Sequence, residues 1–278
     1  LNASGEKREC TALMKELGLN AVRLRVWVNP EEHDNWCNKE DLLVKAKRAK
    51  ALDMDIMVDF HYSDWWADPS KQNIPAAWKS HTYEQMKVDV ADHTNEVLQL
   101  LKSNGITPKW VQVGNETSNG FLWDVGKADK NPTQYAGLFA AGYDAVKKVF
   151  PEAIVMVHLD NGFNNDLYNW NLDILKNNGA KWDMIGMSLY PYWTMQNTDF
   201  SYTKADDVIT DCIANINKVY TKYNCDVMIV ETGMECADNY GNLATKTVLT
   251  EGKRLLTRIL KECKENTNGH CKDHYGCF

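Results

Sequence analysis

The segment KWVQVGNETSNG, residues 109–120, has the pattern of a short strand that ends in an abrupt turn. Residues 110–113 alternate apolar and polar side chains, and Gly114 then marks a change of chain direction. The strand therefore delivers a carboxylate, that of Glu116, to its own carboxyl end. Most glutamates at strand ends are solvated loop residues. A functional role for Glu116 needs a second carboxylate that is presented in the same way.

Strand-like and helix-like segments alternate on both sides of this segment. Nearly continuous apolar runs at 54–62, 153–162 and 225–233 are typical of parallel strands that are covered on both faces. Further strands are expected at 19–28 and 182–191, and helices at 5–18, 38–53, 83–105, 132–151, 165–179, 205–224 and 245–263. The first helix is expected to place Leu13 and Leu17 on one face, and the second to begin at Asn38 as its N-cap.

This order predicts parallel strands joined by helical crossovers. Six full strands and the start of another at 275–278 favour an α/β (β/α)8 TIM barrel over a doubly wound open sheet. No GxGxxG or GxxxxGK[ST] motif occurs at a strand-to-helix turn, which argues against the open sheet. The chain opens on a helix and closes on a strand beginning. We therefore expect residues 1–278 to form a single barrel domain, truncated at both ends, that lacks the first strand and most of the eighth.

Composition narrows the class of partner. The 278 residues are 44% hydrophobic and 25% charged, which is enough to bury a large core. A formal net charge of -7, without a run of Lys or Arg, works against nucleic acid or an anionic membrane as partner. No stretch of eighteen apolar residues occurs. The first residues contain no secretory signal, but the chain also lacks a starting Met, so the compartment stays open.

Eight cysteines are compatible with disulfides or with buried thiols, and the sequence leaves their redox state open. The C-terminal region holds a group of possible zinc ligands, which are Cys263, His270, Cys271, His274 and Cys277. It contains no CxxC pair and no standard zinc-site spacing. We therefore predict no metal site here.

Polar and aromatic residues follow each predicted strand, where the loops of a barrel enzyme converge on one pocket. They are Arg23, Arg25 and Trp27; His61, Asp64, Trp65 and Trp66; Asn115 and Glu116; His158, Asp160 and Asn161; Tyr190 and Trp193; and Glu231. Glu231 is the partner that Glu116 requires, because strands four and seven of an eight-stranded barrel face each other across the mouth. Two opposed carboxylates on a tryptophan-rich site suggest glycoside hydrolysis, in which one protonates the leaving oxygen while the other attacks the anomeric carbon.

The remaining residues suit a sugar ligand, whose C–H faces stack on indole rings and whose hydroxyls bind polar side chains. Tryptophans at or after strand ends are candidate platforms: Trp27, Trp65, Trp66, Trp123 and Trp193. Trp110 and Trp182 begin strands and are expected to pack in the core. His61 is expected to bind either a sugar hydroxyl or a backbone carbonyl. Arg23 is expected to hold Glu231 ionised, with a structural ion pair as the alternative.

These residues resemble glycoside hydrolase family fifty-three, the endo-β-1,4-galactanases. The resemblance rests on GLNAVRLRVWVNP (18–30), DFHYSDWWADPSKQNIPAAW (59–78), WVQVGNETSNGFLW (110–123), HLDNG (158–162) and IVETG (229–233). It implies a retaining barrel glycosidase with Glu116, preceded by Asn115, as acid/base and Glu231 as nucleophile. Arg23, Asn115 and Tyr190 would support them, and His61, Asp64, Asp160, Asn161 and the platform tryptophans would bind substrate.

The resemblance also implies a β-1,4-galactan substrate, no cofactor, a monomer, and a secreted, cell-surface or periplasmic location. Some bacterial members bind calcium in a loop after the seventh strand. The equivalent stretch, residues 234–242, is short, so no required metal is expected. Three alternatives remain: an endo-β-1,4-glycanase for another glycan such as mannan, a non-catalytic glycan-binding barrel and, last, a metal-dependent barrel hydrolase.

Overall fold

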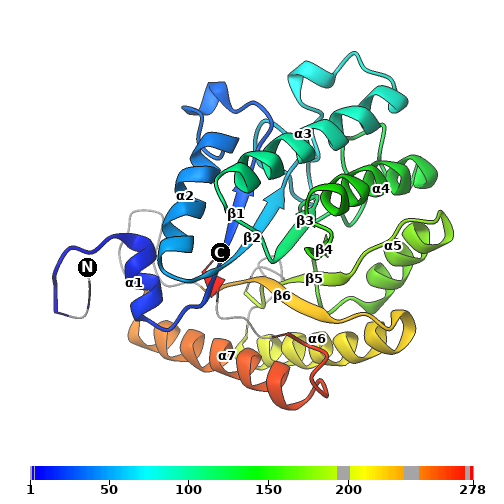
Figure 1. Cartoon of the computed structure of the whole chain (residues 1–278). Helices are drawn as coiled ribbons and strands as arrows, with labels where there is room; N and C mark the ends of the chain where they lie inside the picture. The colour runs from blue at the N-terminus through cyan, green and yellow to red at the C-terminus, as the bar shows by residue number, and fades with distance from the viewer. Residues whose placement is uncertain (1, 3, 193–200, 235–243, 273–275, 278) are drawn as a thin grey trace. The chain divides into compact units, whose positions relative to one another are not determined.

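A computed structural model of the chain describes residues 2, 4–192, 201–234, 244–272 and 276–277 (Figure 1). The chain forms two compact units. The first comprises Leu1–His158, Asn171–Asp183 and His274–Phe278. The second comprises Leu159–Trp170 and Met184–Asp273.

The first unit contains parallel strands in the order β7-β1-β2-β3-β4. Their bounds are β1 (Ala21–Val26), β2 (Asp55–Phe60), β3 (Trp110–Val113), β4 (Ile154–Leu159, of which Leu159 belongs to the second unit) and β7 (Gly276–Cys277). Val26 pairs with Phe60, and Phe60 with Val113. The residues that follow β1, β2 and β3 therefore emerge along one edge of the sheet, which is where the sequence places its candidate site.

Helices of the first unit are positioned by local caps and by apolar faces. They are α1 (Cys10–Glu16), η1 (Glu31–His33), α2 (Lys39–Ala51), η2 (Ala76–Trp78), α3 (Tyr83–Ser103) and α4 (Pro132–Val149). Asn38 accepts a hydrogen bond from the Asp41 backbone, which confirms the predicted N-cap of α2. Thr82 and Gln85 form a capping box at the start of α3. As Figure 1 shows, α2 packs on β1 and β2, α4 packs on β3, and α3 lies against α2 and α4.

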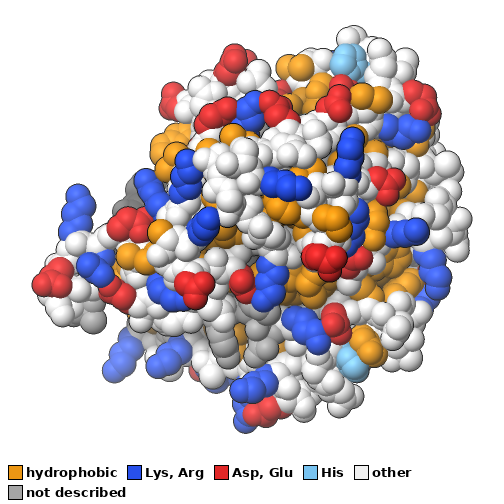
Figure 2. Space-filling view, in the orientation of Figure 1, with side chains coloured by type: hydrophobic (Ala, Val, Ile, Leu, Met, Phe, Trp, Pro, Cys, Tyr) orange, Lys and Arg blue, Asp and Glu red, His pale blue; other side chains and the backbone are white. Residues whose placement is uncertain are grey.

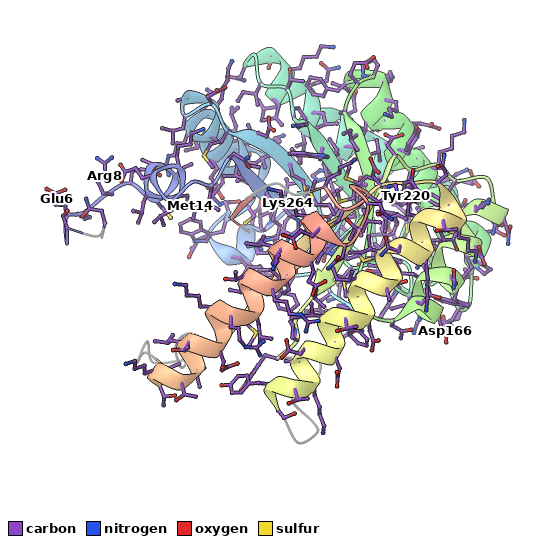
Figure 3. The ribbon with its side chains drawn as sticks, turned by 90° about the horizontal axis from the view of Figure 1, so that it is seen from below. Glu6, Arg8, Met14, Asp166, Tyr220 and Lys264 are labelled. Carbon is purple, nitrogen blue, oxygen red and sulfur yellow. The ribbon has the colours of Figure 1, made fainter. Side chains whose placement is uncertain are left out.

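The second unit contains the parallel pair β5 (Met184–Leu189) and β6 (Val227–Thr232). A register shift after Met187 places Ser188 opposite Glu231. Helices α6 (Tyr202–Tyr223) and α7 (Lys246–Glu265) lie side by side, as Figure 3 shows from below. Arg254 and Arg258 of α7 bind the Asp206 carboxylate of α6 at 2.8 and 2.6 Å. Helix α5 (Asn165–Asn177) contributes residues to both units.

The predicted order of helices and strands is confirmed, including a strand at 276–277, while α1 is shorter than expected. Helix α1 begins at Cys10 because the Glu9 side chain accepts from the Ala12 backbone and caps it there. Leu13 lies within α1, and Leu17 is the C-cap residue that follows it. No residue of α1 is buried, and Leu17 is exposed at its C-cap.

The surface carries mixed charge. On the face in Figure 2, Lys and Arg side chains are interspersed with Asp and Glu, and no large patch of one sign is visible. In the described part of the chain, no helix has the length and apolar character needed to cross a membrane.

Candidate active site

A buried polar network lies at the carboxyl half of β1, β2 and β3. Asp59 and Gln112 are neighbours in the β2–β3 register, and Gln112 Nε2 donates to Asp59 Oδ1 at 2.6 Å. Arg23 Nη2 lies 3.0 Å from Asp59 Oδ2 and 2.7 Å from Asn115 Oδ1, while its Nε donates to Gln112 Oε1 at 3.1 Å. Asn115 also donates to the Ala67 carbonyl at 2.8 Å. The network therefore ties three adjacent strands to the residue that precedes Glu116.

The Asp59 carboxylate is the charge that balances Arg23. Burial alone would raise the pKa of Asp59, but the Arg23 guanidinium, His61 and His158 outweigh that effect and lower the pKa to about 2. The structural ion pair expected as an alternative for Arg23 is therefore present, with Asp59 as partner. Stabilisation of Glu231 by Arg23 involves residues of different units and stays a prediction.

Glu116 sits on an unusual turn of the backbone. Gly114 has φ +83° and Glu116 itself has φ +45°, a region that side chains other than glycine rarely adopt. The Glu116 backbone N–H donates to His158 Nδ1 at 3.2 Å, and the Thr117 N–H donates to the His158 carbonyl at 2.8 Å. Strained residues of this kind persist where the surroundings over-determine them, which is common at functional sites. The turn leaves Glu116 partly exposed between the buried Asn115 and Thr117.

Glu231 lies near the end of β6 in the second unit, beside a phenol. Tyr190, which directly follows β5, donates its hydroxyl to Glu231 Oε2 at 3.0 Å. A Cβ added at Gly233 would lie 3.3 Å from Tyr190 Cε1, so the absence of a side chain at Gly233 leaves room for the ring. Donation to a carboxylate favours its ionised form. The second unit thus presents a carboxyl group, one oxygen of which accepts a hydrogen bond from Tyr190.

An aromatic cluster covers the ends of β1 and β2 in the first unit. Trp65 and Trp66 are 37% and 42% exposed. Trp65 stacks on the His33 ring at a centroid distance of 3.4 Å, and the Arg25 guanidinium lies 3.7 Å from the Trp66 ring. Trp27 lies 4.4 Å from Trp65 and is only 2% exposed. Trp27 therefore offers almost no exposed face on which a sugar could stack, unlike the two exposed indoles that it contacts.

Two polar candidates are engaged within the protein. The Nε2 of His61 lies 3.0 Å from Asp59 Oδ2, and its Nδ1 accepts from the Ala67 backbone at 3.0 Å. His61 therefore binds neither a backbone carbonyl nor, through its nitrogens, a sugar hydroxyl. Asp64 accepts from the backbone of Asn29 at 3.0 Å and of Ala76 at 2.8 Å, one bond to each oxygen. It holds two loops together, and its expected role in direct substrate binding stays a prediction.

The other candidates divide by position. Trp123 is partly exposed, with its indole N–H donating to the Asn119 carbonyl at 2.9 Å. Asp160 and Asn161 are partly exposed in the second unit, where the Asn161 amide donates to Asp160 at 2.6 Å. Trp193 lies outside the described residues. Trp110 is buried at the start of β3, as predicted for a packing residue.

Sequence reasoning missed Asp59 and Gln112. Both are completely buried in strands that are otherwise apolar, DIMVDF and WVQV. A charged or amide side chain at a covered strand position must have partners, because an unpaired buried polar group is costly. The sequence therefore indicates that Asp59 and Gln112 have polar partners, but it does not indicate which residues those partners are.

Comparison with known proteins identifies the family of this chain. The family profile described as "Glycosyl hydrolase family 53" matches residues 1–262. The chain belongs to glycosyl hydrolase family 53. Among solved structures, a fungal β-1,4-galactanase gives a TM-score of 0.84 at 27% identity, covering 98% of this chain and 81% of that one. The family 53 catalytic domain of Ignisphaera aggregans gives 0.83 at 29% identity, covering 97% and 77%. These likenesses show a TIM-barrel-like fold.

The curated relatives are longer than the part of them that this chain matches. A probable arabinogalactan endo-beta-1,4-galactanase A of Aspergillus fumigatus is 34% identical over 238 residues, which are 83% of this chain and 63% of that protein. An endo-beta-1,4-galactanase of Bacillus subtilis is 30% identical over 285 residues, covering 96% and 62%. An uncharacterized protein of Niallia circulans is 38% identical over 197 residues, covering 68% and 53%. The chain therefore spans between about half and two thirds of these relatives.

Proposed function

We propose that this chain is an endo-acting, retaining hydrolase of β-1,4-galactan, the neutral side chain of pectin. Support comes from membership of family 53 and from relatives that are named as galactanases. The observation that carries the proposal is the hydrogen bond from Tyr190 to Glu231, because it prepares an ionised carboxylate at a strand end. Glu116, on its strained turn after β3, supplies the second carboxyl group.

In the proposed mechanism, Glu231 attacks the anomeric carbon while Glu116 gives its proton to the leaving glycosidic oxygen. The bond to the leaving sugar breaks and a galactosyl ester of Glu231 forms. Glu116, now a carboxylate, then removes a proton from water, which attacks the anomeric carbon; the bond to Glu231 breaks, and both groups return to their starting forms. Retention requires carboxyl groups ~5–5.5 Å apart, whereas ~6.5–9.5 Å would correspond to inversion.

The other residues fit a neutral polymer. The exposed Trp65 and Trp66 offer faces on which sugar C–H groups stack, with Trp123 as a further platform. Asp160 and Asn161 offer oxygen and amide groups to hydroxyls. Arg23 and Asn115 act by holding the turn that bears Glu116. We further propose that the protein acts outside the cell, as a monomer and without a metal cofactor, and that chelator leaves its activity unchanged.

The anomeric configuration of the first products tests the mechanism. Proton NMR during digestion of linear β-1,4-galactan should show β-configured oligosaccharides first, with no release from mannan or xylan. First appearance of α-configured ends would exclude retention. Cleavage of mannan instead of galactan would show that galactan is not the substrate.

Azide rescue assigns the two glutamates. Each is changed to Ala, and an aryl β-galactoside with a good leaving group is the substrate. Glu116→Ala should give a β-galactosyl azide and Glu231→Ala an α-galactosyl azide, since azide replaces the water in one case and the nucleophile in the other. Glu152→Ala, at an exposed glutamate before β4, is the control and should behave as wild type. The opposite azide products would make Glu116 the nucleophile and Glu231 the acid/base.

A further inference from the structure

A polar cavity of about 260 Å³ lies in the first unit, at the loop after β1, the start of α2 and the middle of α3. The proposed mechanism uses none of the residues that line it. Its polar lining includes Asn29, Asn35, Lys39, Glu40, His93 and Glu96. The volume is below the ~300–1,000 Å³ of sites for drug-sized ligands, which limits an occupant to one small unit.

His93 is a buried histidine of this lining without a hydrogen-bond partner. It is 8% exposed, and neither ring nitrogen is bonded to another described residue, with Nε2 completely buried. The rings of Phe60, Tyr62 and Trp78 surround it at 5.7, 6.2 and 6.3 Å. Burial lowers the pKa of His93 to about 4, so the ring is neutral at pH 7 and offers one donor and one acceptor. An unsatisfied buried polar group is costly. Of the two ring nitrogens only Nε2 is completely buried, so Nδ1 is the nitrogen that a ligand in the cavity can reach.

The charges of the lining disfavour an ionic ligand. The Lys39 ammonium is paired with Glu96 and lies 3.9 Å from Glu40, so it is already balanced. The two carboxylates repel phosphate, and the lysine repels a metal ion. Among the described residues, no group of His, Cys, Asp or Glu is arranged to hold a metal.

Neutral donors and acceptors complete the lining. The side-chain amides of Asn29 and Asn35 are exposed and make no hydrogen bond to another described residue. Each amide offers two donors and one acceptor oxygen, and His93 adds the ring nitrogen that is not completely buried. A mixture of this kind complements hydroxyl groups, which also donate and accept.

We propose that this cavity binds one neutral sugar unit, separately from the carboxylate site. Its rim is attached to the aromatic cluster, because the Val28 N–H donates to the Ser63 carbonyl at 2.9 Å and Asn29 is clamped by Asp64. Trp65 and Trp66 follow Asp64 directly. A sugar in the cavity therefore lies beside the loop on which the proposed polymer stacks. Binding does not depend on hydrolysis.

Direct observation of the His93 ring by NMR tests this site. The long-range ¹H–¹⁵N spectrum of the full chain is recorded during titration with D-galactose, and then with inorganic phosphate and with glycerol. Galactose should shift the His93 ring signals saturably, and it should do so equally in Trp66→Ala, while phosphate and glycerol leave them in place. No shift of His93 at any galactose concentration, or the same shift with glycerol, would reduce the cavity to a hydrated gap in the packing.

Variants separate binding from folding. Asn29→Ala removes an amide that has no structural bond in its side chain, and should weaken galactose binding about 3- to 10-fold. Asn177→Ala, at an exposed asparagine that ends α5, is the matched control and should bind as wild type. Equal affinities for wild type and Asn29→Ala would remove Asn29 from the site and contradict the proposed lining. If galactan is not cleaved but His93 still responds to galactose, the proposed function fails while this site stands.

Discussion

Arg23 and Asp59 form an ion pair of 3.0 Å whose side chains are only 9% and 1% exposed. The pair joins β1 to β2 and is completed by Gln112 of β3. Buried charges of this kind contribute little net stability over apolar packing, but removal of one partner leaves the other uncompensated. Through the hydrogen bond from Arg23, the pair helps to set the position of Asn115 and of the adjacent Glu116. Loss of either charge should therefore destabilise this region strongly.

Neutralising Asp59 should destabilise the fold strongly. Asp59→Asn removes the buried carboxylate that is paired with Arg23, and we expect a loss of about 3–5 kcal/mol in the free energy of unfolding. Asp55→Asn is the control in the same strand, since its ion pair with Lys109 is largely exposed, and should cost less than about 1 kcal/mol. Urea denaturation measures both. Equal losses would mean that burial does not govern the Arg23–Asp59 pair.

Acid should remove the contribution of Asp59 in a defined pH range. Its pKa is lowered to about 2 in the folded chain, below the ~3.9 of an unfolded aspartate. The unfolded state therefore takes up the proton first as pH falls, and the stabilisation present above pH ~4 is lost toward pH ~2. The stability difference between wild type and Asp59→Asn should shrink by about 2 kcal/mol between pH 5 and pH 2. A constant difference would show that Asp59 is not ionised in the fold.

Removal of the Tyr190 hydroxyl should slow catalysis without affecting stability to the same degree. Tyr190→Phe deletes one hydrogen bond to the Glu231 carboxylate, and we expect kcat on galactan to fall about 10- to 100-fold. Tyr143→Phe deletes a similar bond to Asp183, 3.2 Å long and outside the proposed site, and should leave kcat unchanged. A normal kcat for Tyr190→Phe would contradict the proposal that the Tyr190 hydrogen bond activates Glu231 as the nucleophile.

An alanine at Gly114 should disturb the turn that presents Glu116. Its Cβ would clash with Thr117 Cγ2, in addition to the strain of φ +83°. Gly179 has φ +80° with nothing within 4 Å of an added Cβ, so Gly179→Ala measures the strain alone, roughly 1 kcal/mol. Gly114→Ala should lose more than about 2 kcal/mol and most of its activity. Calorimetry and galactan assays that rank the two variants equally would contradict this account of the turn.

Loss of one exposed indole should weaken polymer binding. Trp66→Ala removes a face that is 42% exposed, and we expect KM for galactan to rise about 2- to 12-fold with a smaller change in kcat. Trp170→Ala removes an indole of nearly equal exposure, 41%, from α5 and should leave KM unchanged. A parallel rise in both variants would indicate non-specific attraction of the polymer to surface aromatics.

Local signals explain what the sequence predicted well. The N-cap at Asn38 and the helix start after Thr82 depend on neighbouring residues alone, and the apolar runs of β2 and β4 report burial on both faces. Tertiary relationships were out of reach. Trp27 and Trp65 both follow strands, yet only the structure shows that Trp27 is enclosed and Trp65 is exposed. Asp59 finds its charge partner 36 positions earlier, at Arg23, which no periodicity indicates.

Trp27 is enclosed whereas Trp65 and Trp66 are exposed, so the rings of this cluster differ in their freedom to change. Trp27 packs among the residues at the ends of β1 and β2, so its replacement by a smaller residue would leave a void. Trp65 and Trp66 contact solvent and can be exchanged for other aromatic or aliphatic residues at little cost to folding. If the proposed role of the cluster holds, glycan preference can therefore evolve at the two exposed positions while Trp27 keeps the packing unchanged.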